Sequence, residues 1–246
     1  METIERKTLL YKSKVEYADY AINHAEGCAH GCKYPCYARL IKKLSYDEWI
    51  KPKLVENATD LLKKELQKGK VPQKSRVYLS FSTDPYMMGY PEVWQMTNNL
   101  IELLLLYGHV PVILTKGLID FDTPFLRNGV EWGITLVSWS LKFATRFEPF
   151  AANPLLRWNR LARLAAKGEN TWVSLEPYPP PTIFNQDIMD ILNTVKFVKR
   201  IVFGRWNYAG IQEHEFYQKT AQVVQDFGKA NRIEVIIKKE IKGNDE

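Results

Sequence analysis

The sequence predicts an α/β fold with a mainly parallel sheet, formed as a single domain over residues 1–246. Of the 246 residues, 46% are hydrophobic and 25% charged, a balance typical of a globular protein with one core. Segments with helical periodicity alternate with short β-rich or continuously apolar segments. A continuous apolar run such as 110–114 indicates a strand covered on both faces, as in parallel sheets.

Three strands and two helices are expected in the first half of the chain. The strands lie at 17–22, 76–81 and 110–114. The first helix begins after Asn57, a residue that favours the N-cap position, and ends at Gly69. Leu62 and Leu66 give this helix an apolar face. The second helix, 91–107, begins at a proline and is followed by a glycine.

The second half continues the alternation. Its strands are expected at 132–137, 171–175 and 200–203, with a short last strand at 233–237. Asn153 followed by Pro154 is a cap with a first-turn proline, and it predicts a helix that ends at Gly168. Further helices are expected at 186–195 and 214–227. Counted from the strand before the cysteines, the pattern gives six βα units without a dividing linker.

Net charge does not identify a partner. The chain has 34 Lys and Arg against 28 Asp and Glu, which gives a formal charge of +6 and a pI of about 9.0. Basic residues are interspersed with acidic ones, as in Lys63, Lys64 and Glu65, so a mixed solvated surface is favoured over a nucleic-acid face. A nucleic-acid substrate stays open.

We expect a soluble, cytoplasmic protein with no membrane partner. Residues 1–11 alternate charged and apolar side chains and lack the apolar stretch and cleavage site of a secretory signal. The best candidate span, 100–114, is interrupted by four unsuitable residues, Glu102, Gly108, His109 and Pro111.

The three cysteines, Cys28, Cys32 and Cys36, all fall within one short segment. An odd number so closely spaced is not a disulfide framework. Two glycines and a proline in the same segment work against a helix that would place the thiols on one face. The segment is predicted as a loop whose glycines let backbone amides approach a bound inorganic centre.

Three thiolates in a loop allow three kinds of site. A structural zinc ion would need a fourth ligand, which His24 or His30 could supply. A four-iron cluster held by three cysteines leaves one iron open to a small chelating ligand. Plain buried thiols are the third possibility.

The segment from Tyr20 to Arg39 resembles the cluster loop of radical S-adenosylmethionine (SAM) enzymes, especially the branch similar to spore photoproduct lyase. The shared pattern is Gly-Cys, a His, a second Cys, an aromatic residue and then Cys-Tyr-Ala-Arg. The usual spacing of three and then two residues between the cysteines is three and three here, because of Pro35. Tyr34 is similar to a family residue that packs near the adenine of SAM.

This resemblance implies a partial TIM-type (β/α)6 barrel with parallel strands and a core at about 17–240, with the site at the C-terminal ends of the strands. It implies a [4Fe-4S] cluster held by Cys28, Cys32 and Cys36, with SAM as the second cofactor. It also implies eight cofactor-binding residues: Tyr34, Ser82, Thr83, Asp84, Lys116, Thr135, Ser138 and Glu148.

Among these, Asp84 and its neighbours are expected to recognise the ammonium group of SAM, and Lys116 its carboxylate. Thr135 and Ser138 would bind the ribose or the carboxylate. Glu148 either forms an ion pair with Arg157 or contacts the cofactor. Three further polar residues after later strands could face cofactor or substrate, namely Glu176, Arg205 and Asn207.

The implied activity is reductive cleavage of SAM to a 5′-deoxyadenosyl radical that takes hydrogen from an unidentified substrate, a nucleic acid or a small molecule, with an external electron donor. The chain has no cysteine outside the loop, so the thiol-dependent repair cycle of spore photoproduct lyases is not expected. Tyr86, Tyr178 and Tyr208 are candidate hydrogen donors. Two other classes stay open: a zinc-stabilised nucleic-acid-binding module and an iron–sulfur electron-transfer protein.

Overall fold

A computed structural model describes residues 1–119, 129–207 and 213–242. It contains an eight-stranded sheet with the order β11-β10-β9-β8-β7-β6-β3-β2. The strands are β2 (Leu10–Lys12), β3 (Tyr20–Ile22), β6 (Arg76–Leu79), β7 (Val110–Thr115), β8 (Glu131–Thr135), β9 (Asn170–Tyr178), β10 (Arg200–Arg205) and β11 (Glu234–Ile237). Neighbouring strands pair in parallel except β2 and β3, which are antiparallel. The predicted α/β fold, a partial TIM-like barrel of mostly parallel strands, is confirmed.

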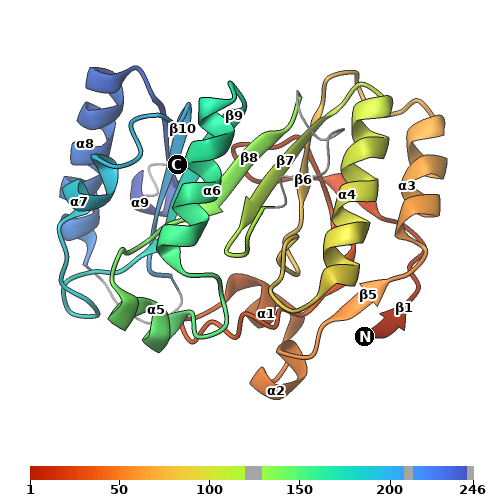
Figure 1. The fold of residues 1–246 in the computed structure, drawn as a ribbon, viewed down its shortest axis with the longest axis horizontal. Coiled ribbons are helices and arrows are strands. Elements are labelled where there is room, and N and C mark those ends of the chain that lie inside the picture. Colours follow the sequence, from red (N-terminus) through yellow and green to blue (C-terminus); the bar gives the residue numbers. More distant parts are fainter. Residues whose placement is uncertain (120–128, 208–212, 243–246) are drawn as a thin grey trace.

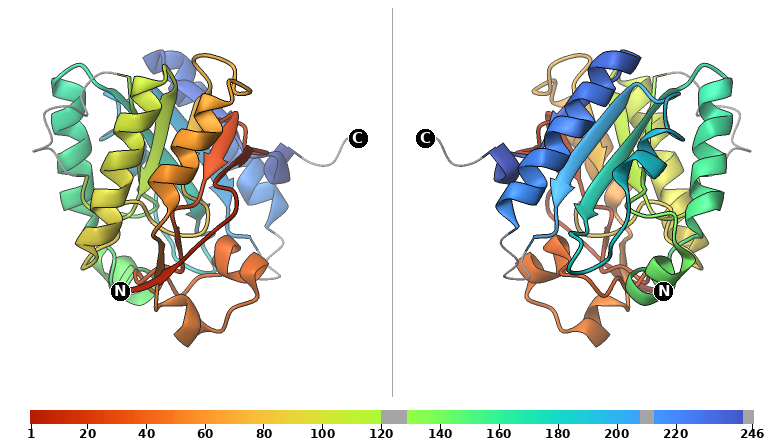
Figure 2. Two further views of the ribbon diagram at one scale, coloured as in Figure 1. Left: turned by 90° about the vertical axis from the view of Figure 1, so that its right-hand side faces the viewer. Right: turned by 90° about the vertical axis from the view of Figure 1, so that its left-hand side faces the viewer.

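Long helices between successive strands cover the outer face of the sheet (Figures 1 and 2). They are α3 (Ala58–Gln67), α4 (Pro91–Leu106), α6 (Pro154–Ala166) and α8 (His214–Asn231), and the short helix α7 (Ile188–Leu192) lies between β9 and β10. Short helices α1 (Tyr37–Lys42), α2 (Tyr46–Trp49), α5 (Leu141–Phe147) and α9 (Lys239–Lys242) complete the described part. In that part, no helix combines the length and the apolar character needed to cross a bilayer.

A second, small sheet consists of β1 (Glu2–Ile4), β5 (Lys53–Val55) and β4 (Ala25–Glu26), in the order β1-β5-β4. This sheet was not predicted. It leads directly into the cysteine segment, because β4 ends where that segment begins. The small sheet therefore supports one side of the loop.

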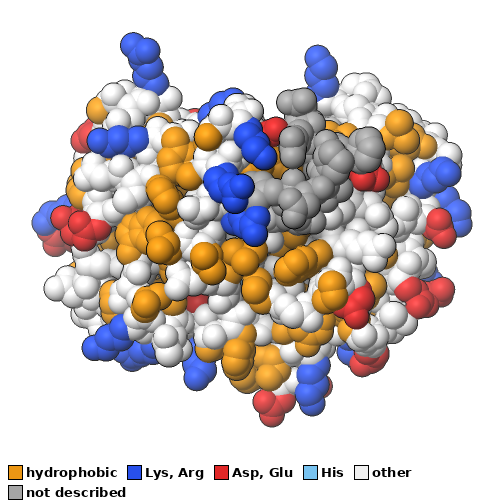
Figure 3. All heavy atoms as spheres, in the orientation of Figure 1, with side chains coloured by type: hydrophobic (Ala, Val, Ile, Leu, Met, Phe, Trp, Pro, Cys, Tyr) orange, Lys and Arg blue, Asp and Glu red, His pale blue; other side chains and the backbone are white. Residues whose placement is uncertain are grey.

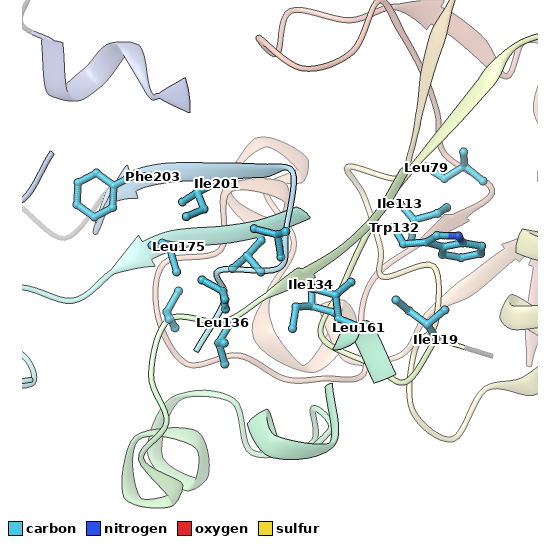
Figure 4. Packing of buried hydrophobic residues seen from close by; sticks show 14 of the residues in the cluster. Leu79, Ile113, Ile119, Trp132, Ile134, Leu136, Leu161, Leu175, Ile201 and Phe203 are labelled. Atoms are coloured by element: carbon cyan, nitrogen blue, oxygen red, sulfur yellow. The ribbon is translucent and has the colours of Figure 1, made fainter. Parts of the chain in front are cut away.

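Successive residues of a strand point to opposite faces of the main sheet. Both faces are apolar, because the residues on each face belong to a hydrophobic cluster. Leu79, Ile113 and Ile201 pack with helical residues such as Leu161 on the outer face (Figure 4). A separate cluster lies on the inner face and consists of Tyr17, Ala18, Ala21, Tyr78, Val112, Trp172 and Val202. The fully buried Trp172 fills much of this interior.

An ion cluster centred on the buried Glu131 and Arg200 holds the N-terminal ends of four strands together. Glu131 Oε2 lies 2.6 Å from Arg76 Nη2 and also pairs with Arg200. Arg200 Nε lies 3.1 Å from Glu234 Oε2. The N-terminal ends of these strands are closed by the ion pairs and by the Trp172 ring. The open space lies at the C-terminal ends of the strands.

Several element boundaries differ from the sequence-based expectation. Asn57 precedes α3, but its side chain makes no cap hydrogen bond and instead exchanges hydrogen bonds with the backbone of Arg6. Asn153 does cap α6, accepting from the amide of Leu155 at 2.8 Å. The helix expected at 186–195 is limited to α7.

The helical face has a mixed surface. Basic and acidic side chains are interspersed over it, and apolar side chains gather on the lower half of the view (Figure 3). The exposed large apolar residues include Leu141, Phe150, Leu155 and Leu156.

Candidate active site

A cavity of about 700 Å³ lies at the C-terminal ends of the strands. Twelve of the residues singled out from the sequence line it: Cys28, Cys32, Tyr34, Cys36, Ser82, Thr83, Asp84, Lys116, Thr135, Glu176, Arg205 and Asn207. They come from the cysteine loop and from the ends of five strands. The sequence pattern and the fold thus bring these residues to one place.

Two of the expected cofactor-binding residues lie outside the lining of this cavity. Ser138 is buried, and its hydroxyl accepts a hydrogen bond of 3.1 Å from the amide of Ser140. Glu148 is buried behind Tyr34. Of the three candidate hydrogen donors, Tyr86 and Tyr178 are buried away from the lining, and Tyr208 lies outside the described residues.

The first bend of the cysteine loop is fixed by Gly27. Its φ is +88°, and a Cβ at this position would lie 2.7 Å from the carbonyl oxygen of Trp49, so a side chain does not fit. The amide of Gly27 donates to Ser82 O at 2.9 Å, and the Thr83 hydroxyl donates to Gly27 O at 2.7 Å. The loop is thereby tied to the segment that follows β6.

The second bend is fixed by Gly31, where φ is +57°. A Cβ here would lie 2.8 Å from the Tyr46 hydroxyl and 3.0 Å from Phe150 Cδ2. That hydroxyl donates to Gly31 O at 2.9 Å, and the amide of Lys33 donates to Phe147 O at 2.9 Å. Both glycines of the motif are required by close approach as well as by backbone conformation.

The three thiols are half-buried and all contact the cavity. Burial raises the pKa of Cys32 to about 12, although the Lys116 ammonium acts in the opposite direction. Burial also raises the pKa of Cys28 well above its ordinary value. Both thiols are therefore protonated at neutral pH when no metal is bound.

The ring nitrogens of the two histidines in this region have neighbours other than the thiols. His24 lies between two hydroxyls, with Nδ1 3.0 Å from Ser80 Oγ and Nε2 2.8 Å from Thr97 Oγ1. His30 Nε2 accepts from the amide of Met88 at 3.1 Å, and its Nδ1 lies 3.4 Å from Asp84 Oδ2. Both ring nitrogens of His24 are thus engaged, whereas Nδ1 of His30 has no hydrogen-bond partner among the described residues, and His30 lines the same cavity as the cysteines.

The described side chains also contain no group of three or more His, Cys, Asp or Glu residues arranged for a single metal ion. A tetrahedral zinc ion with bonds of about 2.3 Å needs its sulfur ligands within about 4 Å of one another.

Asp84 organises the segment between β6 and β7. Its carboxylate accepts from the amides of Tyr86 at 3.0 Å and Lys116 at 2.7 Å and from the Thr115 hydroxyl. Burial alone would raise its pKa, but His30 and these donors lower it to about 2. Asp84 is therefore ionised, and its acceptor positions are largely filled by the protein.

Lys116 projects from the end of β7 over the ring of Tyr34, with Nζ 5.4 Å from the ring centroid. Burial alone would lower its pKa, but Cys32, Glu148 and Asp84 raise it above the ordinary value. The lysine thus supplies a stable positive charge beside the cysteine loop.

Tyr34 is held by a buried ion pair. Its hydroxyl donates to Glu148 Oε1 at 3.1 Å, and Arg157 Nη2 donates to Glu148 Oε2 at 2.6 Å. Of the two roles considered for Glu148, the structure shows the ion pair with Arg157.

A second wall of the cavity was missed by sequence reasoning. It comes from residues 11–17 and 238–240 and includes Glu16, Tyr17 and Lys238. Lys238 Nζ donates to Glu16 Oε2 at 2.9 Å and lies 5.7 Å from the centroid of the Tyr17 ring. These contacts join segments that adjoin the two opposite edges of the sheet, which local sequence patterns do not reveal.

Solved structures share this architecture. A spore photoproduct lyase variant with bound AdoMet and dinucleoside spore photoproduct matches 95% of this chain and 80% of its own, with a TM-score of 0.66 and 13% identity. The chain has the spore photoproduct lyase fold. Streptococcus suis SuiB bound to S-adenosylmethionine matches 88% of this chain and 46% of its own, with a TM-score of 0.59 and 9% identity.

Comparison of sequences adds one relative. No family model matches the chain. An uncharacterised protein of Acidianus two-tailed virus is 25% identical over 218 residues, which cover 77% of this chain and 69% of the viral protein. The spore photoproduct lyase fold is therefore shown by structural similarity and not by a sequence family.

Proposed function

We propose that this protein is a radical SAM enzyme in which Cys28, Cys32 and Cys36 hold a [4Fe-4S] cluster. The observation that carries the proposal is the position of the three thiols, which enter one cavity at the C-terminal mouth of a radical SAM fold. A cluster with three protein ligands leaves one iron for an exchangeable ligand. Both ring nitrogens of His24 are engaged by hydroxyl groups, which favours this donor set over a zinc site closed by His24.

The residues of the cavity have distinct roles in this proposal. The Lys116 ammonium pairs with the carboxylate of SAM, and Tyr34 provides an aromatic surface for its adenine. The Thr135 side chain borders the same cavity and supplies a hydroxyl for the ribose. Asp84 positions the backbone of Lys116 and adds negative charge near the ammonium group of SAM.

The chemistry of bond cleavage belongs to the cofactors. When bound, the cluster supplies the electron that cleaves SAM reductively and releases a 5′-deoxyadenosyl radical. The protein binds and orients SAM, excludes water through its apolar walls and presents the substrate from the second wall. An external donor delivers the electron, and the reducing cytoplasm is the compartment that suits such thiol ligation.

The substrate that we propose contains a nucleobase. The solved neighbour holds a dinucleoside spore photoproduct. In this chain the aromatic residues Tyr17, Tyr78 and Phe81 border the cavity, and aromatic rings can stack on bases. The basic side chains of Lys12, Lys14, Arg205, Lys238 and Lys239 also line it and can neutralise phosphates.

The deciding experiment is anaerobic reconstitution with iron and sulfide, followed by chemical reduction and addition of SAM. We expect a brown protein that forms 5′-deoxyadenosine. Alanine at Cys28, Cys32 or Cys36 should abolish both the cluster and the product, whereas Lys33→Ala, at an exposed position of the same loop, should retain both. A colourless zinc protein, or a cluster that cycles between redox states without product, would contradict the proposal.

A further inference from the structure

Glu176 lies at the cavity end of β9, where the apolar run of that strand stops. Its side chain packs over Gly204 of β10. A Cβ at Gly204 would lie 2.6 Å from Glu176 Cδ and 2.9 Å from its Oε1, so the glycine makes room for the carboxyl group. The position of this carboxyl is set by the sheet and not by a loop.

The Glu176 carboxyl differs from Asp84 and Glu16, which line the same cavity, in having no protein partner. Across the described residues, no donor lies within hydrogen-bonding or ion-pairing distance of it. Asp84 accepts several hydrogen bonds, and Glu16 takes the nearby Lys238. Glu176 is half-buried at the cavity wall, and because no protein group occupies its carboxyl, that carboxyl is available to a bound molecule.

Charged and titratable groups face Glu176 from each neighbouring element. They are Glu16 and Tyr17 before β3, Tyr78 on β6, Lys116 after β7, Arg205 on β10, and Lys238 and Glu240 after β11. Burial raises the pKa of Glu176 to about 7. Lys238 and Lys116 lower it, and Glu240 and Glu16 raise it. Near neutral pH the carboxyl is therefore partly protonated and presents an O–H donor beside a C=O acceptor.

We infer that Glu176 is a specificity-determining residue that forms a pair of hydrogen bonds with a planar N–H/C=O edge of the substrate. A cyclic amide or imide of a nucleobase has such an edge, so the inference rests on the proposed function of this site and names the group recognised. An ionised carboxylate would repel the substrate carbonyl. The neutral acid donates its O–H to that carbonyl and accepts from the substrate N–H. The rings of Tyr78 and Phe81, with centroids 4.5 Å apart, provide apolar surface for a flat group in the same cavity.

Substrate binding would reinforce the required protonation state. Filling the cavity removes water from the carboxyl, which favours its neutral form further. Binding should therefore take up a proton, at about half a proton per molecule near pH 7, and weaken as the pH rises. A cationic amine would behave in the opposite way, because it prefers the ionised carboxylate.

The test uses the reconstituted holoprotein with SAM and measures calorimetric binding of the dinucleotide thymidylyl-thymidine in buffers of different ionisation enthalpy. We expect affinity to fall about tenfold between about pH 6 and about pH 8, with proton uptake. Glu176→Gln keeps a donor and an acceptor, so it should bind within about threefold of wild type at about pH 6, with neither pH dependence nor proton uptake. Glu176→Leu should bind at least about tenfold more weakly.

A second probe keeps the inference testable if a variant does not fold. Thymidylyl-thymidine methylated at N3 of both bases lacks the N–H donor and should bind the wild-type protein at least about tenfold more weakly. Equal binding of the two probes, an unchanged pH dependence in Glu176→Gln, or no dinucleotide binding by protein that forms 5′-deoxyadenosine would overturn the inference. If the protein forms no 5′-deoxyadenosine but still binds the dinucleotide with the expected pH dependence, the proposed function is contradicted and this inference is not.

Discussion

Tyr34 in the cysteine loop donates a hydrogen bond of 3.1 Å to Glu148, which lies at the end of α5. Glu148 is also bound by Arg157 of α6, and Arg157 Nη1 donates to the carbonyl of Thr135 at 2.8 Å. All of these groups except the Thr135 backbone belong to side chains that are almost fully buried. The orientation of the loop therefore depends on an ion pair outside the cavity.

Glu148→Gln should destabilise the protein strongly, because it leaves the Arg157 charge buried with a weaker partner. We expect a loss of about 3 to 5 kcal/mol in the free energy of unfolding. Tyr34→Phe removes only one neutral donor and should cost about 1 kcal/mol. Urea denaturation of the apo proteins measures both values. Similar losses for the two variants would show that the ion pair between Glu148 and Arg157 contributes little to the free energy of unfolding.

Asp84 should make the protein sensitive to acid. Its pKa is lowered from 3.8 to about 2 in the folded state, so its stabilising effect is complete above about pH 4 and is lost as the pH falls through about 2. The contribution is of the order of 2 kcal/mol. Asp84→Asn should be less stable at neutral pH and show a flatter stability profile below about pH 4. Parallel wild-type and variant profiles would contradict the assignment.

Iron uptake should depend on pH, because burial keeps the Cys32 thiol protonated, with a pKa of about 12. Metal binding must displace such protons, so anaerobic cluster assembly should become more favourable from about pH 7 to about pH 9. Lys116→Met removes the charge that favours the thiolate and should shift assembly to higher pH. Lys33→Ala serves as the control with an exposed lysine. Assembly that does not vary with pH in any of these proteins would refute the prediction.

The ion cluster at the opposite end of the sheet should contribute to stability and not to binding. Glu131→Gln removes the carboxylate at the centre of the cluster and leaves the buried Arg200 with only the exposed carboxylate of Glu234, so we expect a loss of about 3 to 5 kcal/mol in the free energy of unfolding. Glu215→Gln makes the same change in an exposed pair with Lys219 and should leave the free energy of unfolding nearly unchanged, because solvent screens that pair. Thermal unfolding of both variants checks this, and a loss at Glu131 no larger than at Glu215 would show that the cluster is dispensable.

The main sheet could be predicted because each strand has apolar side chains on both faces. Ile113 and Val112 are neighbours in sequence but pack in the outer and inner clusters, respectively, so their run is continuous. The small sheet could not be predicted, because its strands have three residues or fewer and are set by pairing between distant segments. The side chain of Asn57 was likewise not predictable from local sequence, because it forms hydrogen bonds with the backbone of Arg6 and not with the helix that follows it.

The cavity could be predicted in part. Residues directly after strands, such as Asp84 and Lys116, reach it because parallel strands end on one side. Ser138 does not line it, because its hydroxyl is used in a local turn before α5. The wall formed by Glu16 and Lys238 depends on a contact between the two edges of the sheet, which no local pattern encodes.

The contact between Glu16 and Lys238 joins positions 222 residues apart in the chain. The cysteine loop emerges from the ribosome long before β11 does. In the nascent chain the cavity around the three thiols therefore lacks its second wall. Until the final strand pairs with β10, solvent and oxygen can reach the loop from that side. Insertion of the proposed centre is therefore expected to follow the pairing of β11 with β10.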